Sequence, residues 1–273
     1  MRAAAVIALA GLALAGAASS LPRPIRSDRY RLYEPLESPE ARGLLERARD
    51  LGRKLLGEPA MPVRQVYLRK SVPLDSASKA PRGFQLTEIT DSTQGVFTIY
   101  LSALPAQPAF AGQLAHEAMH LWNPRLKDAY LEGLNCLLAE EFLKAENLPW
   151  EPWERHFAAG KDPLYGAAYY LARELAEAAG REAVLRMLKF AVERESDYPW
   201  MEVDIDRWLE SLDPPSRARA RAIIARRYLP LEALRRKEQP DLAFRLPRGL
   251  DPAPPPAELV PQVPGPAPAP IGR

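Results

Sequence analysis

The chain has 273 residues, of which 47% are hydrophobic and 26% charged, and its formal net charge is +2. This composition is typical of a soluble globular protein of one or two domains, and the near balance of charge argues against wholesale binding to nucleic acid. Cys136 is the only cysteine, so a disulfide within the chain is excluded.

Residues 1–18 have the pattern of an export signal. Arg2 precedes an apolar run, Ala3 to Ala15, which is followed by the small residues 16–18. The run is shorter than the roughly 20 residues that span a bilayer, which favours a cleaved signal over an uncleaved anchor. We therefore expect a mature protein outside the cytoplasm, periplasmic or secreted, without stable membrane insertion.

A helix and three strands are expected next. Ser38, Pro39 and Glu40 open an amphipathic stretch that ends at Gly57. Three β-like runs follow at residues 65–68, 84–89 and 96–101. A polar turn at residues 91–95 predicts that the second and third runs form an antiparallel hairpin.

From about Ala109 to Lys237 the apolar periodicity is helical. Short breaks fall at residues 123–124, 148–149, 162–163, 180 and 213–215. This order of elements predicts an α+β fold, with a small antiparallel or mixed sheet packed on a helix in residues 19–146. A helical C-terminal subdomain is expected at residues 147–237.

The last segment, residues 238–273, is expected to be disordered. Ten prolines lie between Pro247 and Pro270, with few large apolar residues among them. Each proline removes a backbone donor and fixes φ, so this stretch should form an extended appendage.

The sequence H-E-x-x-H occurs at residues 116–120. On a helix His116 and His120 lie one turn apart on one face, so both imidazoles can reach a single metal ion, while Glu117 projects beside them. Leu114 and Leu121 fall on the opposite side, which would anchor the helix in the core. The alternative is a pair of histidines that only pack or meet solvent.

A catalytic zinc uses three protein ligands and a water, so two histidines leave the site one ligand short. Glu132 is the best-placed third ligand, because Pro124 ends the first helix and Asp128 can cap a second, antiparallel one. Gly133 would let these two helices approach closely. His156 lies in an aromatic stretch that is more typical of packing.

These residues resemble the gluzincin metallopeptidases, and more narrowly the peptidase-MA-like group in which H-E-x-x-H is followed by a helix with an aromatic-x-E-G pattern. The second match is YLEGL at residues 130–134, and residues 165–182 resemble a helix-then-glycine signature downstream. The resemblance covers about residues 96–190. It implies a zincin-like fold in which residues 96–101 form an edge strand, along which a substrate backbone would add.

The resemblance implies one zinc ion held by His116, His120 and Glu132, and a peptide or protein substrate. Zinc would lower the pKa of its water from about 16 to about 7. Glu117 would accept the water proton during attack on the peptide carbonyl and deliver it to the leaving amine.

The oxyanion needs a further donor besides zinc. Tyr165 and Tyr169 lie one turn apart on one helix face and are the candidates, with His156 as a weaker alternative.

Some positions depart from the family pattern. The spacing from His120 to Glu132 is shorter than in many gluzincins, and Glu140 or Glu141 would satisfy the longer spacing. Cys136 stands where many members carry an aspartate that orients a histidine. The sequence therefore predicts an exported zinc-dependent peptidase, with a catalytically inactive zincin-fold binding or assembly module as the alternative. A third hypothesis is a purely helical structural protein.

A basic stretch lies near the end of the helical region. Its spacing predicts an amphipathic helix with a solvated basic face, and weak contact with anionic cell-envelope polymers is a further possibility. The cationic residues are Arg217, Arg219, Arg221, Arg226, Arg227, Arg235, Arg236 and Lys237.

Overall fold

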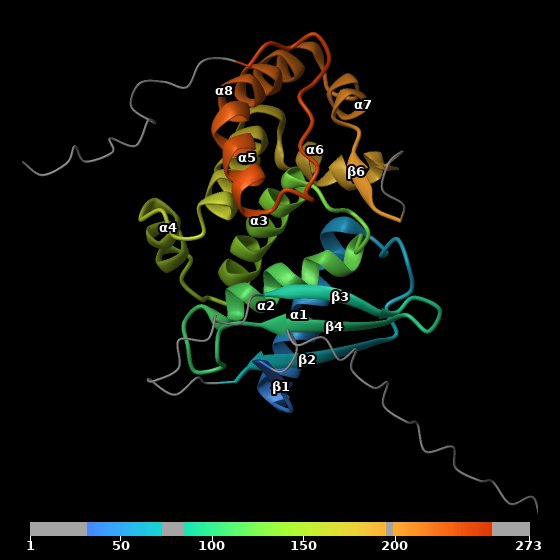
Figure 1. The fold of residues 1–273 in the computed structure, drawn as a ribbon, viewed down its shortest axis with the longest axis vertical. Coiled ribbons are helices and arrows are strands. Elements are labelled where there is room, and N and C mark those ends of the chain that lie inside the picture. Colours follow the sequence, from blue (N-terminus) through green and yellow to red (C-terminus); the bar gives the residue numbers. More distant parts are fainter. Residues whose placement is uncertain (1–31, 73–84, 195–198, 253–273) are drawn as a thin grey trace, which may run out of the picture.

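A small sheet and a stack of helices make up the protein (Figure 1). The computed structural model describes residues 32–72, 85–194 and 199–252. Helices α3 (Ala129–Ala145), α5 (Pro163–Ala179) and α8 (Pro214–Glu238) lie away from the sheet. The expected α+β class is confirmed. Within the described ranges no helix is both long and apolar enough to cross a bilayer.

The sheet is mixed and has the order β1-β2-β4-β3. Its strands are β1 (Tyr33–Pro35), β2 (Gln65–Ser71), β3 (Leu86–Asp91) and β4 (Val96–Leu101). The predicted hairpin is confirmed, since β3 and β4 pair antiparallel, and β2 pairs parallel with β4.

The prediction that residues 96–101 form an edge strand is wrong. Strand β4 pairs on both sides and all six of its residues are buried, whereas β3 lies at the edge of the described sheet. The sequence of β4 explains its central position, because the nearly continuous apolar run VFTIYL suits a strand that is covered on both faces.

The predicted helix boundaries agree closely with the structure. Helix α1 (Pro39–Leu56) begins after Ser38, whose hydroxyl accepts from the amide of Ala41 at 3.2 Å. Helix α2 (Phe110–Met119) continues into a 3-10 turn, η2 (His120–Trp122), which ends before the predicted break. The remaining helical elements are α4 (Glu151–Ala158), α6 (Arg181–Leu185), η3 (Arg186–Phe190) and α7 (Ile205–Glu210).

A second hairpin interrupts the region that was expected to be wholly helical. Strands β5 (Ala191–Glu193) and β6 (Met201–Val203) pair antiparallel. Backbone bonds also join β6 to the connection before α3, from Met201 N to Arg125 O at 2.8 Å and from Lys127 N to Met201 O at 3.1 Å. These partners are remote in the sequence, so local periodicity did not reveal them.

Residues 239–252 are packed, although they fall within the segment expected to be disordered. Leu242 and Phe244 are buried, and Ala243 exchanges backbone bonds of 2.9 Å with Lys127 and Ala129. The apolar side chains that precede most of the prolines account for this packing. The rest of that predicted tail, like the predicted export signal at residues 1–18, lies outside the described residues.

The start of α3 is fixed by Asp128. One carboxylate oxygen accepts from the amide of Tyr130 at 2.8 Å, and the other accepts from the amide of Val203 at 2.9 Å. The first bond is an N-cap, as predicted, and the second joins the helix to β6. Together they set the position of the first turn of α3.

Gly133 permits a close helix contact, but the partner is α5 rather than the predicted preceding helix. A Cβ at this position would lie 2.2 Å from the backbone oxygen of Ala168 and 3.1 Å from the Cβ of Ala172. A side chain here would therefore force α3 and α5 apart.

We expect Gly133→Ala to lower the free energy of unfolding by about 1–3 kcal/mol or more, because backbone atoms cannot move aside as a flexible side chain can. Gly43→Ala is the matched control: there the nearest atom is the mobile end of Arg47, at 3.3 Å. Helix propensity alone favours alanine at both positions by up to about 1 kcal/mol. Chemical denaturation of both variants measures the difference, and equal stability would contradict the close contact.

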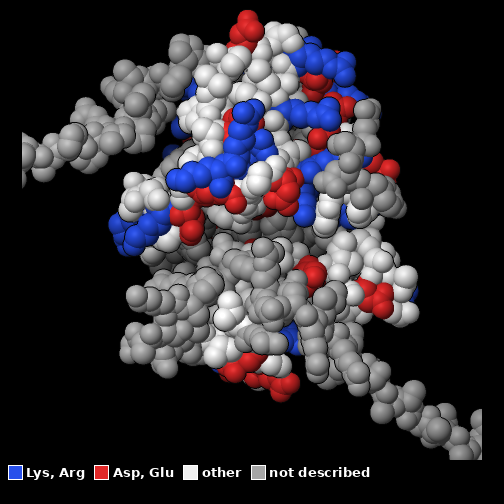
Figure 2. Space-filling view, viewed as in Figure 1, with Lys and Arg blue, Asp and Glu red and all other residues white. Residues whose placement is uncertain are grey.

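The basic helix α8 uses many of its arginines within the protein. Arg226 and Arg227 pair with Glu174 of α5 at 2.8 and 2.6 Å, and Arg219 donates to the carbonyl of Ala178. Figure 2 shows Lys and Arg side chains interspersed with Asp and Glu on the upper part of the face in view. Three cations of the expected solvated basic face, Arg219, Arg226 and Arg227, thus fix α8 to α5, and contact with an anionic envelope stays a prediction.

Candidate metal centre

His116 and His120 occupy consecutive turns at the end of α2. His120 keeps helical angles as the first residue of η2, so the one-turn spacing is preserved. Leu114 and Leu121 are fully buried, which holds the other side of the helix in the core as predicted. The potential ligand atoms of His116, Glu117 and His120 all lie within 4.8 Å of one another.

Glu132 reaches the same histidines from the first turn of α3. Its Oε2 atom lies 3.2 Å from Nε2 of His116 and 3.6 Å from Nε2 of His120, and the residue is 6% exposed. The structure therefore brings together the two imidazoles and this carboxylate from separate elements.

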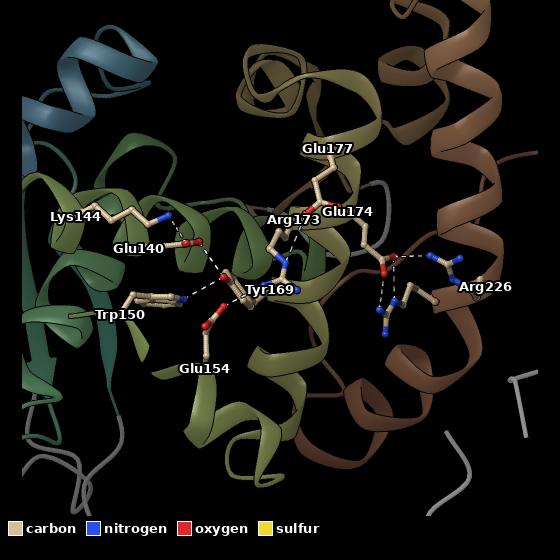
Figure 3. A network of polar contacts seen from close by, with 10 residues as sticks. Glu140, Lys144, Trp150, Glu154, Tyr169, Arg173, Glu174, Glu177 and Arg226 are labelled. Atoms are coloured by element: carbon tan, nitrogen blue, oxygen red, sulfur yellow. Dashed lines mark hydrogen bonds and ion pairs between the residues drawn. The ribbon is translucent and has the colours of Figure 1, made fainter. Parts of the chain in front are cut away.

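Glu140 and Glu141, the alternatives at longer spacing, lie elsewhere. Glu140 accepts from Nζ of Lys144 at 2.6 Å and from the hydroxyl of Tyr169 at 2.9 Å (Figure 3). Glu141 pairs with Arg181 at 3.2 Å. Both carboxylates thus have structural partners away from the histidine pair.

The electrostatics of this cluster favour a cation. Burial lowers the pKa of His120, but the charge of Glu132 and a hydrogen bond to it outweigh burial and raise that pKa to about 9. Burial also acts to raise the pKa of Glu132, yet the two histidines hold it well below its usual range. A proton on His120 therefore supplies the positive charge that the buried carboxylate requires.

The donor set fits a zinc ion. Ligand atoms about 2.0–2.2 Å from a tetrahedral zinc are about 3.3–3.6 Å from one another. The separations of 3.2 and 3.6 Å between Glu132 Oε2 and the two Nε2 atoms are close to that spacing. Imidazole nitrogens and a carboxylate oxygen are also ligand types that zinc prefers.

Glu117 is held by a residue that sequence reasoning missed. The hydroxyl of Thr87, on the edge strand β3, lies 2.7 Å from the backbone oxygen of Glu117 and 2.9 Å from its Oε2. Burial raises the pKa of Glu117, since neighbouring His120 and His116 offset the loss of solvation only in part. The structure thus places a buried, oriented carboxyl group beside the histidines.

Cys136 lies next to His116, with 3.5 Å between Sγ and Nδ1. It occupies the place where the family resemblance suggested an aspartate. Burial raises the pKa of the thiol well above its usual value, so the group is neutral and makes only a weak hydrogen bond.

Tyr165 and Tyr169, considered together from the sequence, are separated by the structure. The ring of Tyr165 meets that of His116 edge-on at 5.6 Å, and its hydroxyl accepts from Nε2 of Gln239 at 2.9 Å. The hydroxyl of Tyr169 instead bonds to Glu140 and accepts from Nε1 of Trp150 at 3.0 Å (Figure 3). Only Tyr165 contacts the candidate metal ligands.

His156 is also placed away from the ligand set. It lies on α4, and its Nε2 atom is 2.8 Å from Oδ2 of Asp162. This pairing gives the third histidine of the chain a partner of its own.

Comparison of the chain with family models, curated proteins and solved structures gives no match. Donor atoms of His116 and His120 lie near Oε2 of Glu132, and the carboxyl group of Glu117 lies beside the two imidazoles, an arrangement with the residue types of a divalent-cation site.

Proposed function

We propose that this chain is a zinc-dependent peptidase of gluzincin type that acts outside the cytoplasm. The observation that carries the proposal is the approach of Glu132 Oε2 to both Nε2 atoms, at 3.2 and 3.6 Å. Zinc held by these three residues would supply Lewis acidity and make water more acidic. The N-terminal sequence pattern supports export.

Glu117 would act as the general base. Its carboxylate would take a proton from the attacking water and pass it to the leaving amine, as the raised pKa of a buried carboxyl favours. The hydroxyl of Thr87 would hold Oε2 in the orientation that this transfer requires. Tyr165 would donate to the oxyanion, since its hydroxyl accepts from Gln239 and retains its own proton.

A peptide substrate would add as a strand along β3. That strand pairs with β4 on one side and forms the edge of the described sheet on the other. Thr87 belongs to the same strand, so the proposed substrate edge and the proposed base are in direct contact. This arrangement supports a zincin-like interpretation of the α+β fold.

The direct test is elemental analysis of the purified chain combined with digestion of a peptide library. We expect about one zinc per chain and cleavage that stops on treatment with a chelator and returns on adding zinc. Absence of zinc from protein purified without chelators, after incubation with zinc salts, would contradict the proposal.

A separate prediction concerns Thr87. We expect Thr87→Val to lower kcat by about 10- to 150-fold, because a hydrogen bond to a charged group contributes about 1.5–3 kcal/mol. Thr87→Ser should retain most activity. Zinc content should be the same in both variants.

Thr90→Val is the control for loss of a hydroxyl on β3, since the Thr90 hydroxyl bonds to that of Thr98 instead. Equal kcat values for Thr87→Val and Thr90→Val would show that Thr87 does not orient Glu117.

The second candidate is a zincin-fold binding or assembly module without catalysis. The neutral thiol of Cys136 beside His116 favours it, because a carboxylate in that place would orient the imidazole more strongly. This function predicts bound zinc without cleavage of any peptide in the library.

A further inference from the structure

The end of α8 lies beside the helix that carries Tyr165. Helices α5 and α8 pack side by side and run in opposite directions, so that Arg227 in the middle of α8 bonds to Glu174, while Gln239 at its end bonds to Tyr165 in the first turn of α5 (Figure 1). The chain that follows α8 therefore starts next to the candidate metal centre, although it is far from the two histidines in sequence.

Residues 239–243, which we call the C-terminal strap, are fixed at both ends. The backbone amide of Gln239 ends α8 by donating to the carbonyl of Arg235 at 2.9 Å. The guanidinium of Arg235 donates in turn to the carbonyl of Leu242 at 2.8 Å, and Ala243 is bonded through its backbone to the connection before α3. These bonds set the position from which the Gln239 side chain extends.

The side chain of Gln239 makes a contact that the strap does not need for its own structure. Backbone bonds already end α8 and hold the strap, whereas the Gln239 side chain is half-buried and its Nε2 atom lies 2.9 Å from the hydroxyl oxygen of Tyr165. The residues just before it, Arg236 to Glu238, are exposed. The side chain is therefore turned inward, toward Tyr165.

This hydrogen bond has a defined direction. An amide nitrogen can only donate, so the Tyr165 oxygen accepts from Gln239 and its own proton must point elsewhere. The ring of Tyr165 also meets that of His116 edge-on, with 5.6 Å between the centroids. A tyrosine whose proton remains available to donate is thus held beside a candidate metal ligand.

We propose that Gln239 is a positioning residue, which holds the Tyr165 hydroxyl so that its proton is directed to the oxyanion of the reacting peptide. The inference rests on the proposed peptidase function. Without this donor, the hydroxyl could turn its proton to water or to another acceptor. Because a donor that is aligned in advance needs no reorganisation during the reaction, its loss should affect the transition state more than substrate binding.

Gln239→Glu tests the direction of the bond, because a carboxylate of nearly the same shape accepts the Tyr165 proton instead of donating. We expect kcat for the best-cleaved library peptide to fall about 10²-fold, as on loss of one oxyanion donor, with KM changed by less than about twofold. Gln239→Leu removes the bond without adding charge and should lower kcat by about 2- to 12-fold.

The added charge in Gln239→Glu could also act on the site directly, so the substitution is repeated in the Tyr165→Phe background. If Gln239 acts through Tyr165, it should have no further effect there beyond about twofold, whereas a direct effect of charge would persist. Gln94→Glu, in the exposed turn between β3 and β4, is the matched control for added charge and should leave kcat unchanged.

Two further measurements do not depend on turnover. A phosphinic analogue of the peptide mimics the tetrahedral intermediate, and calorimetry on the zinc-loaded chain should show about 10²-fold weaker binding to Gln239→Glu. The carbon-13 resonance of Tyr165 Cζ, assigned from its loss in Tyr165→Phe, should shift in Gln239→Leu with or without zinc. An unshifted resonance would contradict the hydrogen bond itself.

The possible failures are distinguishable. Chemical denaturation shows whether each variant is folded, and if Gln239→Glu is not, kcat and the Tyr165 resonance of Gln239→Leu decide. A chain that binds no zinc or cleaves no peptide overturns the peptidase function and this inference with it. A chain that cleaves peptides but keeps its kcat in Gln239→Glu, or loses it equally in the Tyr165→Phe background, overturns only the role of Gln239.

Discussion

Replacing Glu117 with glutamine should reduce kcat/KM for peptide hydrolysis by about 10²- to 10⁴-fold or more, while zinc content stays at the level of the unmodified chain. Glutamine keeps the size and a hydrogen-bonding oxygen of the side chain, so Thr87 can still bond to it, but the amide cannot take a proton from water. Initial rates on the best-cleaved library peptide and zinc stoichiometry are the two measurements.

Glu141→Gln is the control for this substitution. Glu141 is a partly exposed carboxylate that pairs with Arg181 and lies outside the histidine cluster, so its loss should leave hydrolysis unchanged. Retained turnover in Glu117→Gln would eliminate the assigned base. A loss of zinc from that variant would instead indicate that Glu117 is a ligand, as its distance to the histidines also permits.

The second large effect is expected for Glu132→Ala. Loss of a residue that only hydrogen-bonds to a metal ligand typically lowers metal affinity by about 10- to 100-fold. Loss of a ligand itself should cost more, so we expect zinc affinity to fall by about 10²-fold or more. The measurement is the zinc dissociation constant from competition with a chromogenic chelator.

Glu140→Ala and Glu141→Ala are the matched comparisons, since each removes a carboxylate from the same helix. Glu140 is bonded to Lys144 and Tyr169, so its loss should reduce stability without changing zinc affinity. If zinc affinity fell in either of these variants and not in Glu132→Ala, the third ligand would be misassigned.

Local sequence was sufficient for most helix boundaries and for the histidine pair. Ser38, Gly57 and the prolines at positions 163 and 214 mark helix ends through φ restriction and capping, which depend on neighbouring residues alone. The one-turn spacing of His116 and His120 likewise follows from helix geometry. The placement of Glu132 could be anticipated because a short connection joins the two helices.

Strand order, by contrast, depended on long-range pairing. The sequence indicates that β3 and β4 are adjacent, but the insertion of β4 between β2 and β3 is a contact between segments some thirty residues apart. The family resemblance implied a substrate edge at residues 96–101, which form β4, whereas the described sheet has β3 at its edge. Thr87 was missed for the same reason, since alternation within a strand defines its two faces without showing which one meets α2.

The sequence by itself determined the α+β class, the helix limits and the two histidines with their neighbouring glutamate, because these follow from local periodicity and backbone chemistry. Tertiary structure alone decided that Thr87 contacts Glu117, that Tyr165 rather than Tyr169 lies against His116, and that Gln239 reaches Tyr165 from the end of α8. Each of these features joins elements that are distant along the chain, and their meeting depends on how the whole core packs.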